Sequence, residues 1–156
     1  MVEQDRFTRG FYAGLIAGVL QNILSFLSYA LGLTTLRMAD WSAVIIFGKS
    51  GPFSTGEIML GLASHIVWCG TLGIIFVYLI LYVKHQHFTL KGLIFGWSVW
   101  FLIYGVTLLY KVEPTLGLPI KTPLSDLIGA SVYGLVLVWS LTKLKENVSN
   151  ETKSRP

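Results

Sequence analysis

The sequence predicts an all-α polytopic membrane protein with four transmembrane helices. Only 13% of its 156 residues are charged and 53% are hydrophobic, whereas a soluble domain usually carries about 25% charged residues. Four apolar segments come near or exceed the ~20 residues that span a bilayer. They are Gly10–Leu33, Glu57–Val83, Leu90–Tyr110 and Pro123–Leu141. We therefore expect one four-helix transmembrane domain over residues 1–142 and a polar tail over residues 143–156.

The first span carries a narrow stripe of small and weakly polar residues on an otherwise apolar helix. At ~100° per residue, this stripe contains Gly10, Gly14, Gly18, Gln21, Ser25, Ser28 and Gly32. Small residues let membrane helices approach closely. We therefore expect the stripe to pack against other helices and Ile16, Val19 and Ile23 to face lipid. A lining for a lipid tail or a narrow solute path is the alternative. Glu3, Asp5 and the length of the apolar run argue against a cleaved signal peptide.

The connection Thr34–Gly56 contains an apolar patch at residues 41–47 that is too short to span. Asp40 is placed to cap a short helix there and Gly48 to end it. We expect this helix to lie in the membrane interface or to fold back on the bundle. Ser54 and Glu57 have the spacing of a capping box for the second span.

The remaining helix boundaries have simpler signals. Residues 84–87 are expected to end the second span and to form a tight turn into the third. Thr122 and Pro123 look like an N-cap followed by proline at the first helical position of the fourth span. From Thr142 onward the chain becomes polar, and we expect a frayed, disordered tail.

Basic residues are distributed unequally between the two sides of the predicted membrane domain. One side carries Arg6, Arg9, Lys84, Lys91, Lys143, Lys145, Lys153 and Arg155, and the other carries Arg37, Lys49, Lys111 and Lys121. The side that is richer in Lys and Arg is normally cytoplasmic. This asymmetry predicts that both termini, and with them the tail, lie in the cytoplasm.

The two halves of the chain share a pattern. Arg9 precedes Gly10 and Gly14 as Lys91 precedes Gly92 and Gly96. Glu57 and Asp126 lie near corresponding ends of spans two and four. With two spans in each half, equivalent helices run in the same direction, which predicts a parallel repeat about an axis along the membrane normal.

The second half resembles a known family in its glycine and aromatic residues. The run Gly92-Leu-Ile-Phe-Gly96-Trp97-Ser-Val-Trp100-Phe-Leu, then Pro114, then Tyr133-Gly134-Leu-Val, is similar to YqhR-type membrane proteins of spore-forming bacteria. More distantly, the layout resembles YagU-type inner-membrane proteins. The resemblance implies a four-span protein of the bacterial inner (plasma) membrane. These families bring no established activity and no functional residues.

Polar side chains inside the spans are the candidate site residues. Gln21 and Asn22 carry amides near the middle of the first span, where an amide needs a hydrogen-bond partner. His65 is the histidine inside the second span, and we expect it to face the bundle interior near Gln21 or Asn22. Helix–helix hydrogen bonding is one interpretation of these three residues, and a polar substrate site is the other.

Two further interpretations involve ionisable residues. His65 and Cys69 are four residues apart on one helix face and offer two metal ligands, but a site needs three or four; we predict neither metal nor cofactor. Glu57, His65 and Asp126 are the candidate members of a proton path. Against that path, Glu57 and Asp126 both lie in a first helical turn, where a carboxylate complements the helix dipole.

The function class is predicted mainly by exclusion. The sequence has no nucleophile–base–orienter pattern, phosphate loop or paired acids, and its basic residues lie at helix ends, so we expect neither an enzyme nor a nucleic-acid-binding protein. The leading prediction is a non-catalytic helical bundle in the lipid bilayer that packs with itself or with another membrane protein. The alternative is a small transporter or channel with a polar site around Gln21, Asn22 and His65.

Overall fold

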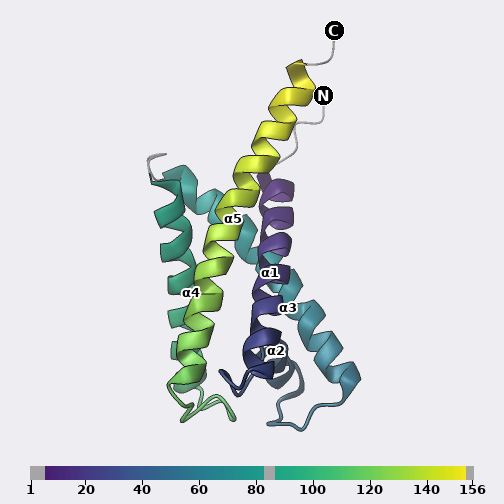
Figure 1. The fold of residues 1–156 in the computed structure, drawn as a ribbon, viewed down its shortest axis with the longest axis vertical. Helices are drawn as coiled ribbons and strands as arrows, with labels where there is room; N and C mark the ends of the chain where they lie inside the picture. Colours follow the sequence, from purple (N-terminus) through teal and green to yellow (C-terminus); the bar gives the residue numbers. More distant parts are fainter. Residues whose placement is uncertain (1–5, 83–86, 154–156) are drawn as a thin grey trace.

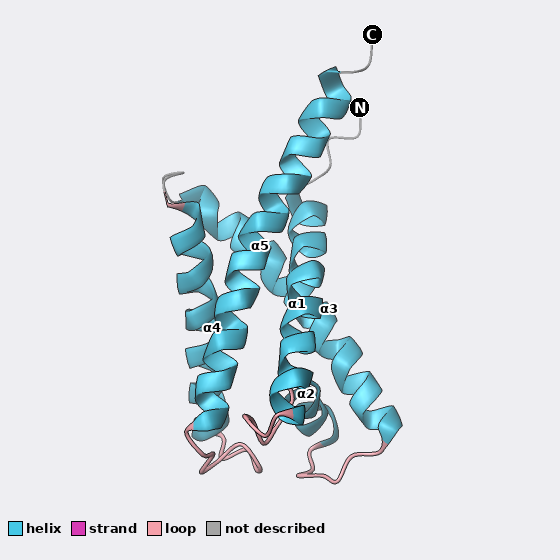
Figure 2. Ribbon diagram, in the orientation of Figure 1, coloured by secondary structure: helices cyan, strands magenta, loops and turns pink. Residues whose placement is uncertain are grey.

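A computed structural model describes residues 6–82 and 87–153 and confirms the predicted fold class. The described residues contain no strand and form five α-helices (Figure 2). These are α1 (Arg6–Ala30), α2 (Met38–Phe47), α3 (Thr55–Leu79, continued by the 3-10 turn Ile80–Tyr82), α4 (Phe88–Leu109) and α5 (Lys121–Lys153). In length and hydropathy, α1, α3, α4 and the part of α5 from Lys121 to Leu144 can each cross a membrane, and α2 is the short apolar helix between spans one and two.

The helices pack in the order α2, α3, α1, α5 and α4. Helix α1 contacts α3 and α5, α5 contacts α4, and α2 contacts α3. The start of α1 and the end of α5 lie at one end of the bundle, and α2 lies at the other end (Figure 1). Helix α4 is therefore joined to the bundle mainly through α5. Among the four long helices, α3 and α4 are the two ends of an open arrangement.

Glycines bring α1 and α3 into backbone contact, as the stripe predicted. A Cβ atom on Gly14 would collide with the Cys69 carbonyl group, and one on Gly73 would collide with the Gly10 carbonyl oxygen. Gly18 lies against the Cys69 side chain. The predicted lipid-facing residues are indeed exposed, with exposed fractions of 42% for Ile16, 43% for Val19 and 50% for Ile23. Gly32 is the exception in the stripe, because α1 ends at Ala30 and Gly32 has a positive φ of 68° in the following turn.

Glycines also bring the backbones of α4 and α5 into close contact. Gly92 lies against the Gly134 backbone of α5, and a Cβ atom on Gly96 would collide with the Ala130 carbonyl oxygen. In both pairs the contact involves two glycines four residues apart near the start of the first helix. This likeness of the α1–α3 and α4–α5 pairs is what the predicted repeat requires.

Helix α2 begins differently from the prediction. Asp40 is not the N-cap; the N-cap is Arg37, and Asp40 is the third helical residue. The Asp40 Oδ2 atom accepts a hydrogen bond from the Arg37 backbone N–H at 2.8 Å, and the guanidinium group binds both carboxylate oxygens. These bonds, led by the side-chain hydrogen bond, raise the pKa of Arg37 above its usual value. Gly48 ends the helix as predicted, with a φ of 61°.

Helix α2 folds back on the bundle. The Met38 backbone N–H donates to the Ser25 hydroxyl of α1 at 2.9 Å. The Arg37 guanidinium lies 5.1 Å from the Phe26 ring centre and 4.8 Å from that of Tyr29, distances at which a cation is attracted to an aromatic face. The start of α2 is thus attached to the last two turns of α1.

The boundaries of the other helices agree in part. Ser54 and Glu57 form the predicted capping box. Thr122 is not an N-cap, because α5 already begins at Lys121; its hydroxyl accepts from the Thr35 backbone N–H at 3.1 Å instead. Helix α5 continues to Lys153 where a frayed tail was expected, because that polar segment is rich in good helix formers such as Lys and Glu. The predicted turn at residues 84–87 lies mostly outside the described residues.

Two glycines of α4 test the close backbone contact. Gly96 lies against α5, whereas no atom lies within 4 Å of a Cβ built on Gly105. We expect Gly96→Ala to lower the stability of the bundle in detergent by about 1–3 kcal/mol, since α5 must move away. Gly105→Ala should be neutral or stabilising by up to about 1 kcal/mol, because alanine favours the helix. Unfolding curves of the two variants check this, and equal effects would contradict the assigned contact.

Candidate functional site

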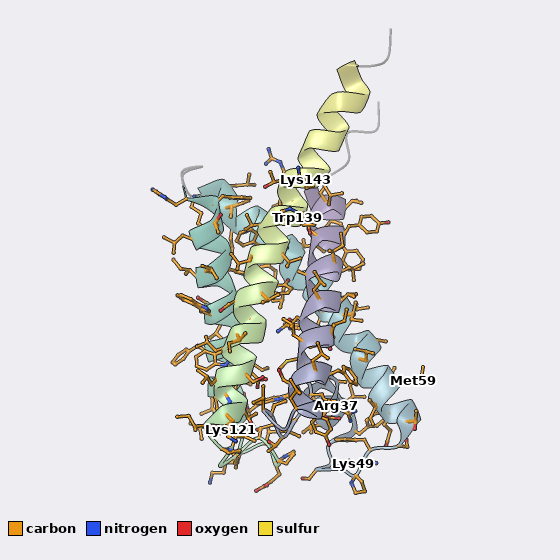
Figure 3. The ribbon with its side chains drawn as sticks, in the orientation of Figure 1. Arg37, Lys49, Met59, Lys121, Trp139 and Lys143 are labelled. Carbon is orange, nitrogen blue, oxygen red and sulfur yellow. The ribbon has the colours of Figure 1, made fainter. Side chains whose placement is uncertain are left out.

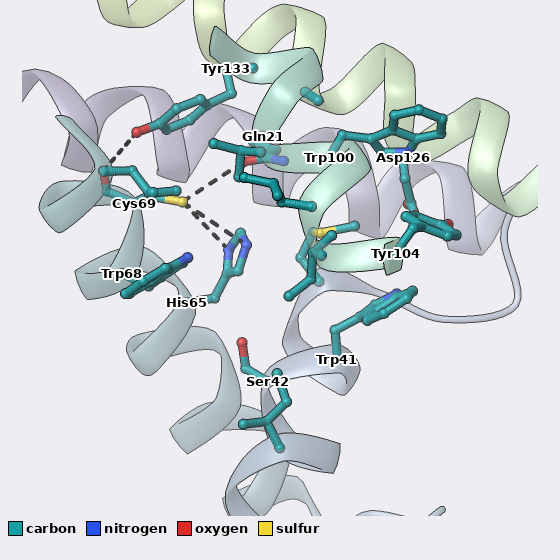
Figure 4. A pocket seen from close by; sticks show the side chains of 18 of the residues that line it. Gln21, Trp41, Ser42, His65, Trp68, Cys69, Trp100, Tyr104, Asp126 and Tyr133 are labelled. Atoms are coloured by element: carbon teal, nitrogen blue, oxygen red, sulfur yellow. Dashed lines mark hydrogen bonds between the residues drawn. The ribbon is translucent and has the colours of Figure 1, made fainter. Parts of the chain in front are cut away.

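A cavity of about 520 Å³ lies inside the bundle. Its walls come from α2 and α3 on one side and from α4 on the other, with α1 and α5 also contributing (Figure 4). It forms where the open arrangement leaves α3 and α4 without extensive contact. Most of its lining is apolar. Several lining residues are exposed on the outer surface: Ile45, Ile46, Trp68, Leu102 and Val106 are 44–63% exposed. The cavity therefore opens among side chains that face the lipid.

Asn22 and His65 form the predicted contact between α1 and α3. The Asn22 Nδ2 atom lies 2.8 Å from His65 Nδ1 and also donates to the Gly18 carbonyl oxygen at 2.8 Å. Because Asn22 uses its amide N–H groups for both bonds, His65 Nδ1 is the acceptor. The imidazole is then neutral with its proton on Nε2. His65 lines the cavity, while Asn22 is buried behind it with its Oδ1 atom unpaired among the described groups.

Gln21 and Cys69 extend this polar group along the cavity wall. The Cys69 Sγ atom lies 3.8 Å from both Gln21 Oε1 and His65 Nδ1, as Figure 4 shows. Behind them, the Tyr133 hydroxyl donates to the Cys69 carbonyl oxygen at 2.7 Å and joins α5 to α3. Hydrogen bonds therefore connect α1, α3 and α5 at the same depth in the bundle.

Asp126 lies elsewhere in the same cavity wall. It is not in the first turn of its helix as predicted, because α5 already begins at Lys121. The Asp126 side chain is 5% exposed, and its Oδ2 atom accepts a hydrogen bond from the Tyr104 hydroxyl at 2.7 Å. Tyr104 in turn lies between two indoles, with ring centres 5.3 Å from Trp41 and 5.4 Å from Trp100. The Asp126 carboxylate, surrounded by aromatic side chains, is therefore a second polar site in the cavity wall. It is separate from the His65 group, by which we mean Gln21, Asn22, His65 and Cys69.

Glu57 does not belong to this site. It caps the start of α3, where its carboxylate pairs with Lys49 at 2.6 Å and does not line the cavity. The structure brings together Gln21, Asn22, His65 and Asp126 around the cavity and leaves Glu57 at the helix end. A continuous path through all three ionisable residues of the predicted relay is therefore absent from the described part of the chain.

A smaller cavity of about 50 Å³ adjoins the large one. It shares Gln21, Met38 and Asp126 with the large cavity, and the hydroxyl residues Ser25, Ser28 and Ser125 add to its lining. It extends from Asp126 between α1 and α5, among residues near the end of α1 and the start of α5. Asp126 thus borders both cavities.

The aromatic part of the site was not predicted. Trp41, Trp68, Trp100 and Tyr104 line the cavity from three different helices. The spacing of four residues places Trp100 and Tyr104 on one face of α4, but no period links them to Trp41 or Trp68. Within residues 6–82 and 87–153, no three His, Cys, Asp or Glu side chains are grouped to hold a metal ion. No family model, curated protein or solved structure matches this chain.

The Asn22–His65 bond can be tested by two substitutions at one position. His65→Leu leaves the Asn22 amide without its acceptor, so we expect the free energy of unfolding to fall by about 1–3 kcal/mol. His65→Gln keeps an acceptor within reach and should cost clearly less. A double-mutant cycle with Asn22→Leu, measured by unfolding in mixed micelles, should give a coupling of about 0.6–2 kcal/mol. Equal losses for Leu and Gln, with no coupling, would contradict the bond.

Proposed function

We propose that this chain is a non-catalytic, membrane-embedded binding protein that holds one small amphipathic molecule in the cavity between α3 and α4. The observation that carries the proposal is the cavity itself. Its volume of about 520 Å³ falls in the range of ~300–1,000 Å³ that is typical of small-molecule sites. It opens on the surface that faces lipid, so a ligand can enter from the bilayer.

The distribution of polar groups supports an amphipathic ligand. Most of the lining is apolar. Its polar side chains are the group around His65, the pair Asp126 and Tyr104, and the hydroxyl residues Ser42 and Ser64. The indole Nε1–H groups of Trp41 and Trp100 lack partners among the described residues. Both indoles line the cavity, so their rings form part of its wall. A site of this kind also fits the alternative role of a small transporter.

Association with itself or another membrane protein is the second candidate function. It is favoured by the outer face of α4, where Phe101, Leu102, Leu108 and Leu109 are 63–75% exposed. Partner contacts on this face would also cover the side of the bundle that packing leaves open.

We further propose the location that the sequence suggests: the bacterial inner membrane, with both termini cytoplasmic, in a protein related to the YqhR-type family. Lys143 lies at one end of the bundle, and Arg37, Lys49 and Lys121 lie at the other (Figure 3). This separation supports the proposed orientation, in which the side of the membrane that carries more Lys and Arg is cytoplasmic.

Filling the cavity tests the proposed function. Ser64 lines the cavity, whereas Ser98 is exposed on α4 and does not line it. We expect the neutral apolar fluorophore N-phenyl-1-naphthylamine to bind saturably to the protein in nanodiscs, with empty nanodiscs as the blank. Ser64→Phe should remove the saturable component, and the matched control Ser98→Phe should retain it. No saturable binding to the unmodified protein, or equal binding to both variants, would overturn the proposal.

A further inference from the structure

Asp126 is the one acidic side chain that lines the cavity, and no Lys or Arg lines it within the described residues. The other ionisable groups of the wall are His65 and Cys69 on α3, Tyr104 on α4 and Tyr133 on α5. The His65 imidazole is neutral, because its Nδ1 atom accepts a hydrogen bond from Asn22. The fixed charge that the wall can present is therefore a single negative charge on Asp126.

Asp126 also differs from two other carboxylates of the described chain. Asp40 is paired with Arg37 at 2.8 Å, and Glu57 is paired with Lys49 at 2.6 Å. Asp126 is buried, and among the described side chains its carboxylate accepts a hydrogen bond from the Tyr104 hydroxyl. A buried carboxylate at membrane depth is unfavourable unless a proton or a cation compensates it. The cavity beside Asp126 is where such a cation fits.

The walls around Asp126 suit a large, poorly hydrated cation. Trp41, Trp100 and Tyr104 form a connected aromatic cluster with ring centres 5.3–5.4 Å apart, and all three line the cavity. Trp68 lines it from α3, and Figure 4 shows it beside His65, on the other side of the cavity from Trp100. Aromatic faces attract cations most when both are removed from water. The apolar remainder of the wall accommodates the body of the ligand.

We propose that the amphipathic ligand is a lipophilic monocation, such as a quaternary ammonium or phosphonium compound, whose charge is balanced by Asp126. This proposal rests on the proposed binding function and names its ligand class. The ligand enters between α3 and α4 from the lipid and places its charge between the Asp126 carboxylate and the aromatic cluster. A proton on Asp126 is the alternative counter-charge, so proton and ligand exclude each other at this site.

Two probes of matched shape and opposite charge test the proposal. Tetraphenylphosphonium and tetraphenylborate differ mainly in the sign of their charge. We expect the purified full chain to bind tritiated tetraphenylphosphonium saturably in equilibrium dialysis and tetraphenylborate at least about tenfold more weakly. Asp126→Asn keeps an acceptor for Tyr104 but loses the charge, so it should weaken phosphonium binding at least about tenfold, as expected for removal of one member of a buried charge pair.

Controls separate charge from folding. Asp126→Glu retains the charge and should keep most of the affinity, and Glu57→Gln removes an acid outside the cavity and should leave binding unchanged. Lowering the pH should weaken phosphonium binding to the unmodified protein and not to Asp126→Asn. The naphthylamine titration shows whether each variant still has a working cavity.

The outcomes distinguish the two proposals. If the naphthylamine binds but the phosphonium ion does not, or if Asp126→Asn binds it as well as the unmodified protein, the ligand class is wrong and the binding function stands. Equal binding of the borate and the phosphonium ion would also overturn the ligand class alone. If neither the naphthylamine nor the phosphonium ion binds, both proposals fall.

Discussion

The close approach of helix backbones at glycines holds α1 against α3 and α4 against α5. Lipid is as apolar as leucine, so it offers no hydrophobic force between these helices, and packing must supply the attraction. Gly14 against Cys69 and Gly96 against Ala130 leave no room for a Cβ atom. The two tight pairs are then joined through α1 and α5. Because α3 and α4 are held by their own partners, they contact each other mainly where Phe76 packs on Phe88 and Phe95, and the cavity is the space that remains between them.

Polar groups at membrane depth must find partners within the bundle, and most of them do. Asn22 bonds His65, the Tyr133 hydroxyl bonds a backbone carbonyl group, and the Trp97 indole bonds Ser131 at 2.8 Å. These bonds lie between helices and add to the packing. Asp126 also has a partner, the Tyr104 hydroxyl, but its carboxylate lies beside a largely apolar cavity, and the ion pairs of the described residues do not include it. An ionisable side chain in this position inside a membrane protein is a candidate functional residue.

The fold and part of the site could be predicted because few backbone structures and few side-chain orientations are stable in lipid. A span must be an apolar helix, small residues must face other helices, and an amide or imidazole must point inward. These rules led from the sequence to the glycine stripe and to the pairing of His65 with Asn22. The cavity could not be predicted, since it depends on where along their length α3 and α4 lose contact with each other. Nor could the cluster of Trp41, Tyr104 and Asp126, whose members come from three helices with no shared period.

The central claim is that the cavity between α3 and α4 holds a bound molecule beside Asp126 and the aromatic cluster. The most direct measurement is a crystal structure of the protein grown from a lipid mesophase with tetraphenylphosphonium present. We expect separated α3 and α4 helices and electron density for the cation beside Asp126 and the aromatic cluster. Direct packing of α3 against α4, with side chains filling the cavity and Asp126 turned to a protein partner, would contradict this claim.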